Sequence, residues 1–258
     1  MLHWWLAWAI AVLSRANRAH AIVQNADDRD FLIRGRVTPA ERVTLIPGSG
    51  VDTTLFTPAP EPDGPVTIMM VARLLHDKGV GELVEAARRL RASGVYVRVW
   101  IVGDRDSENP RSVSKDEIAA WQREGIVTFL GRRSDVAALW AQVHIAALPS
   151  YYGEGVPKSL LEAGACGRPI VTTDMPGCRD LVPDGSTGIL VPPRDTGALA
   201  EALDSLARSP SRRHQMGRAA RALVVEHFDE ARVAAATTSC YSEMLELTRA
   251  PQSSARAE

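Results

Sequence analysis

The chain lacks the features that mark several common classes of protein. It has only three cysteines in 258 residues, and their odd number and spacing fit no zinc-binding pattern. A reduced, cytosolic setting is therefore expected. The 30 lysines and arginines balance the 31 aspartates and glutamates, leaving a net charge of -1. This balance offers no general argument for binding nucleic acid or for a polybasic membrane contact.

Two further absences narrow the choice. No G-x-G-x-x-G pattern follows the first expected strand, which argues against a dinucleotide-dependent dehydrogenase. The apolar N-terminal run, residues 1–13 (MLHWWLAWAIAVL), is too short to span a bilayer, and it lacks the leading positive charge of a signal peptide. Three interpretations of this run stay open: a helix that packs on a partner surface, a peripheral membrane contact at the inner face of the cell membrane, or a cleaved signal.

The rest of the chain alternates between short apolar runs and segments of helical periodicity. The runs predict strands at 21–24, 43–47, 66–72, 95–102, 127–130, 143–148 and 188–191. The periodic segments predict helices at 28–34, 79–92, 116–123, 134–142, 196–207, 211–226 and 230–248, the first of them capped by Asp27. Such alternation predicts an α/β fold with a Rossmann-like parallel sheet and helices on both faces.

The most informative segment runs from residue 149 to 182, PSYYGEGVPKSLLEAGACGRPIVTTDMPGCRDLV. It combines a strand end, a glycine-bearing turn, a helix from Pro157 to about Cys166 and a second strand. The positive start of such a helix presents free N–H groups and binds phosphate readily. The amides in question belong to Gly155, Val156, Lys158 and Ser159.

Two glutamates, Glu154 and Glu162, lie eight residues apart across this turn and helix. The helical rise separates them by roughly 8–10 Å, about the distance from a sugar to the ribose of a nucleotide diphosphate. One carboxylate could hold sugar hydroxyls and the other ribose hydroxyls. Both could equally be ordinary carboxylates at the start and on the surface of a helix.

Two cations favour the first alternative. Arg73 and Lys78 lie in VARLLHDKG, directly after the expected strand 66–72. This position places both at the carboxyl edge of the sheet, where a guanidinium fork and an ammonium can grip a diphosphate. Together with the glutamates, they predict a site for a nucleotide diphosphate.

Several stretches together resemble the nucleotide-sugar-binding half of a glycosyltransferase family 4 enzyme. They are IPGSGVD, VARLLHDKG, IVGD, FLGRRSDV, the 149–182 segment and GILVPPRD. The resemblance implies the C-terminal domain of a GT-B fold over residues 21–250. It also implies that residues 1–20 are the last helix of an N-terminal acceptor domain that is largely missing, with a disordered tail at 251–258.

The resemblance also implies roles for individual residues. Glu154 would lie beside the donor sugar, Glu162 at the ribose, and Arg73 and Lys78 on the departing diphosphate. Glu154, Arg73 and Lys78 are therefore the catalytic candidates. The remaining donor-binding candidates are Gly155, Val156, Pro157 and Leu161 at the diphosphate end and, beside the base, Gly131 and Arg132, with Arg133 following. Gly48 to Asp52 would line the hinge side of the cleft.

The activity implied is transfer of a hexose, with retention of configuration, from a nucleotide-diphosphate sugar, a UDP-sugar being expected. The acceptor would be a glycan or a polyprenyl-diphosphate-linked saccharide in polysaccharide biosynthesis, with no cofactor and no metal. Because the acceptor half is missing, a separate polypeptide could supply it. Two alternatives stay open: a nucleotide-sugar-binding module without turnover, and another GT-B relative such as an epimerase or a phosphorylase.

Other residues compete for attention with weaker patterns. Two D-x-D sequences, Asp28–Asp30 and Asp104–Asp106, resemble metal–diphosphate motifs but are expected to open a helix and to lie in a polar loop. His76, beside Arg73 and Lys78, could have a minor phosphate role. The buried candidates are expected to be packing residues: His144, Cys166, Cys178, Trp100, Trp121 and Trp140.

Overall fold

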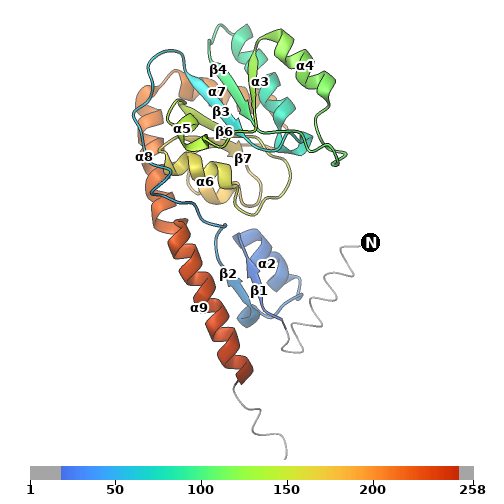
Figure 1. Cartoon of the computed structure of the whole chain (residues 1–258), viewed down its shortest axis with the longest axis vertical. Helices are drawn as coiled ribbons and strands as arrows, with labels where there is room; N and C mark the ends of the chain where they lie inside the picture. Colours follow the sequence, from blue (N-terminus) through green and yellow to red (C-terminus); the bar gives the residue numbers. More distant parts are fainter. Residues whose placement is uncertain (1–18, 250–258) are drawn as a thin grey trace, which may run out of the picture.

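The computed structural model describes residues 19–249 and contains a six-stranded, wholly parallel sheet (Figure 1). Its strands lie in the order β5-β4-β3-β6-β7-β8. Their bounds are β3 Thr67–Val71, β4 Arg98–Val102, β5 Val127–Gly131, β6 Ile145–Leu148, β7 Ile170–Thr173 and β8 Gly188–Val191. The central strands β3 and β6 are buried almost throughout, which explains why they appear in the sequence as continuous apolar runs. The predicted α/β sheet is confirmed.

Helices cover both faces of this sheet. They are α3 Val80–Ala92, α4 Lys115–Glu124, α5 Val136–Trp140, α6 Lys158–Ala165, α7 Thr196–Ala207 and α8 Pro210–His227. Helix α3 contacts α7, and α6 contacts α8. In α3 the buried residues recur at helical spacing, including Val80, Leu83, Val84, Ala87 and Leu90. These apolar faces and the strands between them form one continuous core.

The first two strands do not join the main sheet. Strands β1 (Ala21–Val23) and β2 (Val43–Leu45) pair in parallel as a separate two-stranded sheet around helix α2 (Ala26–Arg34). The single sheet predicted from residue 21 onward is therefore wrong at this point. Residues 46–66 carry the chain from this small unit, β1–α2–β2, to the main sheet, and the small unit lies beside the long helix α9 (Glu230–Arg249) (Figure 1).

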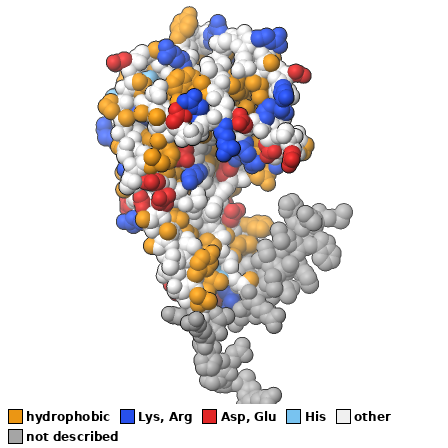
Figure 2. Space-filling view, in the orientation of Figure 1, with side chains coloured by type: hydrophobic (Ala, Val, Ile, Leu, Met, Phe, Trp, Pro, Cys, Tyr) orange, Lys and Arg blue, Asp and Glu red, His pale blue; other side chains and the backbone are white. Residues whose placement is uncertain are grey.

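The small unit and α9 enclose a groove of about 770 Å³. Ile22 and Ile46 line it from one side, and Ala234 and Tyr241 line it from α9. Figure 2 shows hydrophobic side chains exposed along this narrow part of the molecule, and Tyr241 and Leu245 are more than half exposed. An isolated two-stranded sheet is marginal in water, so the small unit depends on its contacts with the rest of the chain.

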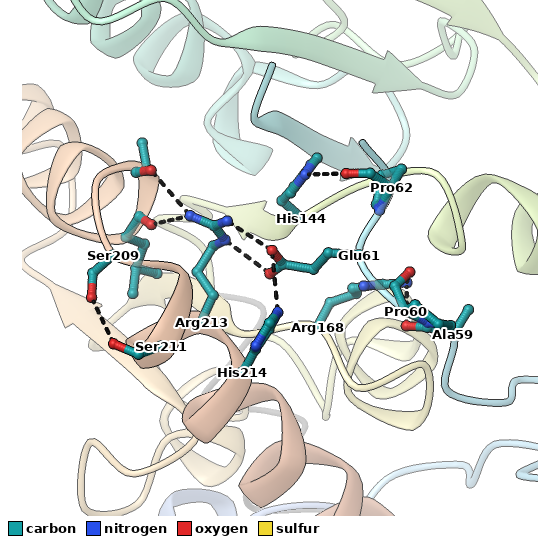
Figure 3. Close-up of polar contacts among 12 residues, drawn as sticks. Ala59, Pro60, Glu61, Pro62, His144, Arg168, Ser209, Ser211, Arg213 and His214 are labelled. Carbon is teal, nitrogen blue, oxygen red and sulfur yellow. Dashed lines mark hydrogen bonds and ion pairs between the residues drawn. The ribbon is translucent and has the colours of Figure 1, made fainter. Parts of the chain in front are cut away.

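The proline-rich connection 57–65 is fixed at the amino edge of the main sheet (Figure 3). Arg213 donates two hydrogen bonds to the Glu61 carboxylate, at 2.8 and 2.7 Å. Arg168 donates to the carbonyls of Ala59 and Pro60 at 3.0 and 3.4 Å. Burial opposes the charge on Glu61, but Arg213 outweighs it and holds the pKa of Glu61 below its ordinary value. This connection is therefore an anchored part of the fold.

Three local predictions differ from the structure. Asn25, not Asp27, caps α2, because its side chain accepts a 2.8 Å hydrogen bond from the amide of Asp28. Strand β4 begins at Arg98 rather than Val95, and α5 is a five-residue helix within the predicted 134–142. Within residues 19–249 no helix is long and apolar enough to cross a membrane. The predictions for residues 1–13 and 251–258 lie outside the described residues.

Candidate functional site

The predicted site residues meet at the carboxyl edge of the main sheet, where strand order reverses direction. From β3 the chain proceeds to β4 and β5 on one side, and then returns to β6, β7 and β8 on the other. The loops that leave β3 and β6 therefore separate at the point where open α/β sheets bind their ligands. Arg73 and Lys78 follow β3, and Glu154 follows β6. The topology thus brings together residues that are about 80 positions apart in the sequence.

Lys78 and Glu154 form the centre of this site. The Lys78 ammonium pairs with Oε1 of Glu154, and both side chains are less than one fifth exposed. The hydroxyl of Ser150, which is fully buried, lies 2.9 Å from the same carboxylate oxygen. A short 3-10 turn, His76–Lys78, ends at Gly79 with φ of 81° and directs Lys78 toward the β6 loop. A Cβ at Gly79 would lie 2.1 Å from the carbonyl of Pro149, so this approach requires glycine.

Arg73 lies at the rim of the site. Its side chain is 63% exposed, and its Nη1 pairs with Oδ2 of Asp106 at 3.1 Å. An exposed ion pair of this kind contributes at most about 1 kcal/mol. Arg73 can therefore exchange Asp106 for a ligand anion at little cost in free energy.

A second arginine, Arg111, stands on the opposite loop. Its Nη1 lies 2.7 Å from Oδ2 of Asp77, a buried residue whose other carboxylate oxygen has no partner among the described residues. The Arg111 guanidinium also lies over the ring of Tyr152, 5.0 Å from its centroid. Arg111 therefore links the 104–113 loop to the turn that carries Asp77 and to the loop after β6.

The start of α6 presents unpaired backbone amides, as the sequence predicts. The amides of Gly155, Val156, Lys158 and Ser159 find no backbone acceptor among the described residues. Pro157 is the N-cap, so the helix begins at Lys158, one residue after the predicted start, and Cys166 is its C-cap. Gly48 packs against this start, since a Cβ there would lie 3.2 Å from Val156 and 3.5 Å from Leu161. The IPGSG stretch thus lines the site from the side of the small unit.

Glu162 lies one turn further along α6 and is half-buried. Burial raises the pKa of Glu162, and the positive charge of Lys158, on the same helix face, offsets part of that rise. The indole N–H of Trp140 is buried and has no hydrogen-bond acceptor among the described residues. Its dipole lies near Glu162 and also lowers the pKa of that carboxyl. Without a ligand, the ionised carboxylate of Glu162 is therefore poorly solvated.

The loop after β5 completes the edge. Gly131 ends the strand with φ of 64°, and its carbonyl accepts a 2.9 Å hydrogen bond from Gly103 after β4. Arg132 is exposed, and no described residue pairs with it. Arg133 instead pairs with Asp135 at 2.6 Å. Arg132 can therefore meet a ligand without breaking an ion pair, whereas Arg133 would first have to release Asp135.

The competing residues take structural roles. His144 is buried, with Nδ1 accepting from the amide of Thr67 at 3.0 Å and Nε2 3.1 Å from the carbonyl of Pro62. Cys166, Cys178 and Trp140 are buried in the interior, and Trp121 stacks on Phe129. His76 faces Glu117 at 3.7 Å. No group of metal-ligating side chains capable of holding an ion occurs among residues 19–249.

Sequence reasoning missed four residues that shape the site. They are Asn25, Asp77, Arg111 and Ser150, which contact Glu154, its loop or the turn that carries Lys78. Ser150 and Asp77 stand within the highlighted motifs, so their positions offered a signal. Asn25 and Arg111 stand in unremarkable polar stretches, and only the tertiary contacts reveal them.

Comparison with known proteins shows the family to which the chain belongs. A family model described as "Glycosyl transferases group 1" matches residues 52–223, well over half of the chain. The chain belongs to this family. The family match and the similar solved structures place the chain in the GT-B superfamily. The six-stranded sheet corresponds to the C-terminal, Rossmann-like domain of that fold.

Individual relatives of the chain are also named as glycosyltransferases. The chain is 37% identical over 139 residues to the N,N'-diacetylbacillosaminyl-diphospho-undecaprenol alpha-1,3-N-acetylgalactosaminyltransferase of Campylobacter jejuni, covering 54% of this chain and 35% of that protein. It is 36% identical to the putative colanic acid biosynthesis glycosyltransferase WcaL of Escherichia coli, covering 64% and 42%. The chain thus spans less than half the length of these two relatives.

A solved structure supports the same fold. The HepE protein of Anabaena, in complex with UDP, superimposes with a TM-score of 0.79 over 91% of this chain and 66% of HepE. The sequence identity between the two is 22%, so this similarity concerns the fold alone.

Proposed function

We propose that this chain is the donor-binding part of a retaining glycosyltransferase of family 4. It would bind a nucleotide-diphosphate sugar, a UDP-sugar in the first instance, and deliver the sugar to a glycan or polyprenyl-diphosphate-linked acceptor. The observation that carries the proposal is the Lys78–Glu154 pair at the free amino end of α6, at the reversal of strand order. The Campylobacter relative, whose name includes a diphospho-undecaprenol, supports the class of acceptor.

The geometry suits a diphosphate leaving group. As the glycosidic bond breaks, negative charge grows on the phosphate oxygens of the departing nucleotide. The free amides at the start of α6, together with Lys78 and Arg73, would stabilise that charge more in the transition state than in the ground state. Retention then follows from a front-face reaction, in which the departing diphosphate accepts the proton of the attacking acceptor hydroxyl.

The two glutamates have different environments, which fits two different roles. Glu154 is held by Lys78 and Ser150, so its carboxylate is already oriented for donor-sugar hydroxyls. Glu162 is half-buried and carries a raised pKa, so it gains most from a ligand that donates hydrogen bonds to it. A pair of ribose hydroxyls would satisfy that requirement.

An N-terminal half, from the same polypeptide or a separate one, would supply the acceptor side of the cleft. The alternative function is a nucleotide-sugar-binding module without turnover. Both functions require nucleotide binding, and they differ only in transfer.

Calorimetry of the full chain with UDP tests the shared requirement. We expect Lys78→Met to weaken UDP binding about 10- to 150-fold, the value of a charge-assisted hydrogen bond of about 1.5–3 kcal/mol. The matched control is Lys115→Met, an exposed lysine at the start of α4, which should bind UDP as the wild type does. Equal UDP affinities in the two variants would refute the site.

Transfer then separates the two functions. The chain is mixed with an N-terminal half from a relative, and labelled sugar is followed from a UDP-sugar to a lipid-linked acceptor. Transfer that is lost in Glu154→Ala, with UDP binding retained, would support the enzyme. Persistent binding without any transfer would favour the binding module.

A further inference from the structure

The side chain of Asn25 connects the small unit to the backbone of Glu154 in the candidate site. It is 1% exposed, although it lies at the turn between β1 and α2. Its Oδ1 caps α2, while its Nδ2 donates to the backbone carbonyl of Glu154 at 3.2 Å and to Oδ2 of Asp28 at 2.9 Å. Asn25 therefore connects the small unit directly to the residue placed at the donor sugar.

Neighbouring contacts join the small unit and the main unit at the same place. A Cβ at Gly155 would lie 2.0 Å from the side-chain oxygen of Gln24. The loop after β6, residues 149–157, which we call the donor loop, is therefore in close contact with the β1–α2 turn. Asp27 pairs at 2.7 Å with Arg179, which also binds Asp174 beyond β7. Together these contacts press the small unit against the main unit beside Glu154.

The opposite side of the donor loop is also fixed. The amide of Glu154 donates to the carbonyl of Pro176 at 3.3 Å, and Gly177 lies so close that a Cβ there would be 1.5 Å from the carbonyl of Gly155. The peptide groups on either side of Glu154 are thus held by two different units: its amide by the main unit and its carbonyl by Asn25. Removal of either bond frees the backbone from which the Glu154 side chain projects.

We propose that Asn25 is a positioning residue for Glu154, which orients the donor loop toward the sugar of the nucleotide-diphosphate sugar. The inference rests on the proposed function, because it assigns Glu154 to the donor sugar. Asn25 belongs to the small unit and Glu154 to the main unit, so the seating of one unit on the other sets the donor-sugar contact. Lys78 and the amides of Lys158 and Ser159 lie within the main unit beyond this peptide, whereas the Gly155 amide belongs to the same peptide group as the carbonyl that Asn25 holds.

One substitution separates this role from helix capping. Serine caps helices as well as asparagine does, but its hydroxyl is too short to cap α2 and also reach the carbonyl of Glu154. Asn25→Ser therefore keeps the cap and removes the contact. Asp195→Ser, at the N-cap of α7, makes the corresponding change at a cap whose side chain bonds to Ala198, away from the donor loop.

Two measurements on the full chain test the proposal. The first is hydrogen exchange of the free protein, followed by mass spectrometry on the peptide that spans residues 150–156. Loss of one net hydrogen bond should speed exchange of this loop about fivefold in Asn25→Ser and leave it unchanged in Asp195→Ser. The second is calorimetry with UDP, UDP-glucose and UDP-N-acetylglucosamine. We expect a smaller loss of affinity for UDP than for the UDP-sugars, so that the advantage of the better UDP-sugar over UDP falls roughly fivefold.

Each outcome decides a separate point. Unchanged exchange of the loop in Asn25→Ser would overturn the proposal. Faster exchange with an unchanged UDP-sugar advantage would also overturn it, because Asn25 would then be structural only. If the wild-type chain binds no UDP, the proposed function fails, while the exchange comparison still supports or overturns the hold of Asn25 on the loop.

Discussion

Replacement of Glu162 by glutamine should weaken nucleotide binding and stabilise the free protein at the same time. In the ligand-free chain the carboxylate is half-buried, and burial raises its pKa above the ordinary value. The folded state thus holds the proton more tightly than the unfolded state does, so ionisation at neutral pH destabilises the fold. Glutamine has the same shape but no charge, and it removes that penalty.

The magnitude of the binding loss follows from the hydrogen bonds. A bond to a charged group contributes about 1.5–3 kcal/mol and a neutral one about 0.5–1.5 kcal/mol. Glutamine can still accept from ribose hydroxyls, so the loss is about 1–1.5 kcal/mol for each bond. Two bonds correspond to a loss of about 2–3 kcal/mol, or roughly 30- to 150-fold in the Kd for UDP.

The assay combines calorimetry with UDP and thermal unfolding between pH 4 and 8. Glu201→Gln is the control, because Glu201 is an exposed glutamate on α7. In Glu162→Gln the midpoint of unfolding should exceed that of the wild type at pH 7, and the difference should vanish as the pH falls and the wild-type carboxyl becomes protonated. Equal UDP affinity in Glu162→Gln and Glu201→Gln would refute the ribose role. A lower midpoint at pH 7 would refute the desolvation argument.

Three other predictions concern the stability of the fold. Arg213→Met should destabilise the protein by up to about 3–5 kcal/mol in urea unfolding, because it removes both hydrogen bonds to the largely buried Glu61 carboxylate and leaves only the half-exposed His214, at 3.4 Å, whereas the exposed Arg212→Met should cost under about 0.5 kcal/mol. Burial lowers the pKa of His144, so its stabilising contribution is complete above about pH 6.5 and is lost as the pH falls below that value; a His144→Gln variant should show a flatter midpoint–pH profile there, and an unchanged profile would contradict this account. Gly177→Ala should destabilise far more than Gly185→Ala, since both have φ of 78° but only the first meets backbone, 1.5 Å from a carbonyl oxygen; equal unfolding free energies would show that the close contact relaxes freely.

The distribution of contacts also explains why the small unit matters to the main one. Residues 21–45 form too small a sheet to bury much apolar surface, and none of the residues of α2 is buried. The unit is nevertheless fastened to the donor loop by Asn25 and by the Asp27–Arg179 pair. Its position beside the site is therefore specified by polar contacts more than by a hydrophobic core.

The sequence alone determined the elements of the main sheet and most residues at its carboxyl edge. Buried parallel strands such as β3 are apolar along their whole length, so they can be predicted from the local sequence. The first turn of a helix leaves free amides, and Pro157 marks where that turn begins. Arg73, Lys78 and Glu154 were predicted because they follow strand ends, and Glu162 because the helical rise sets its distance from Glu154.

Only the tertiary structure decided which of these residues touch and where the first two strands belong. Pairing of Lys78 with Glu154 depends on the adjacency of β3 and β6, and β1 and β2 form a sheet of their own that is joined to the loop after β6 through Asn25. Asn25 appears in the sequence as a helix cap and nothing more. Its second bond joins residues 129 positions apart, a distance at which neither periodicity nor propensity carries information.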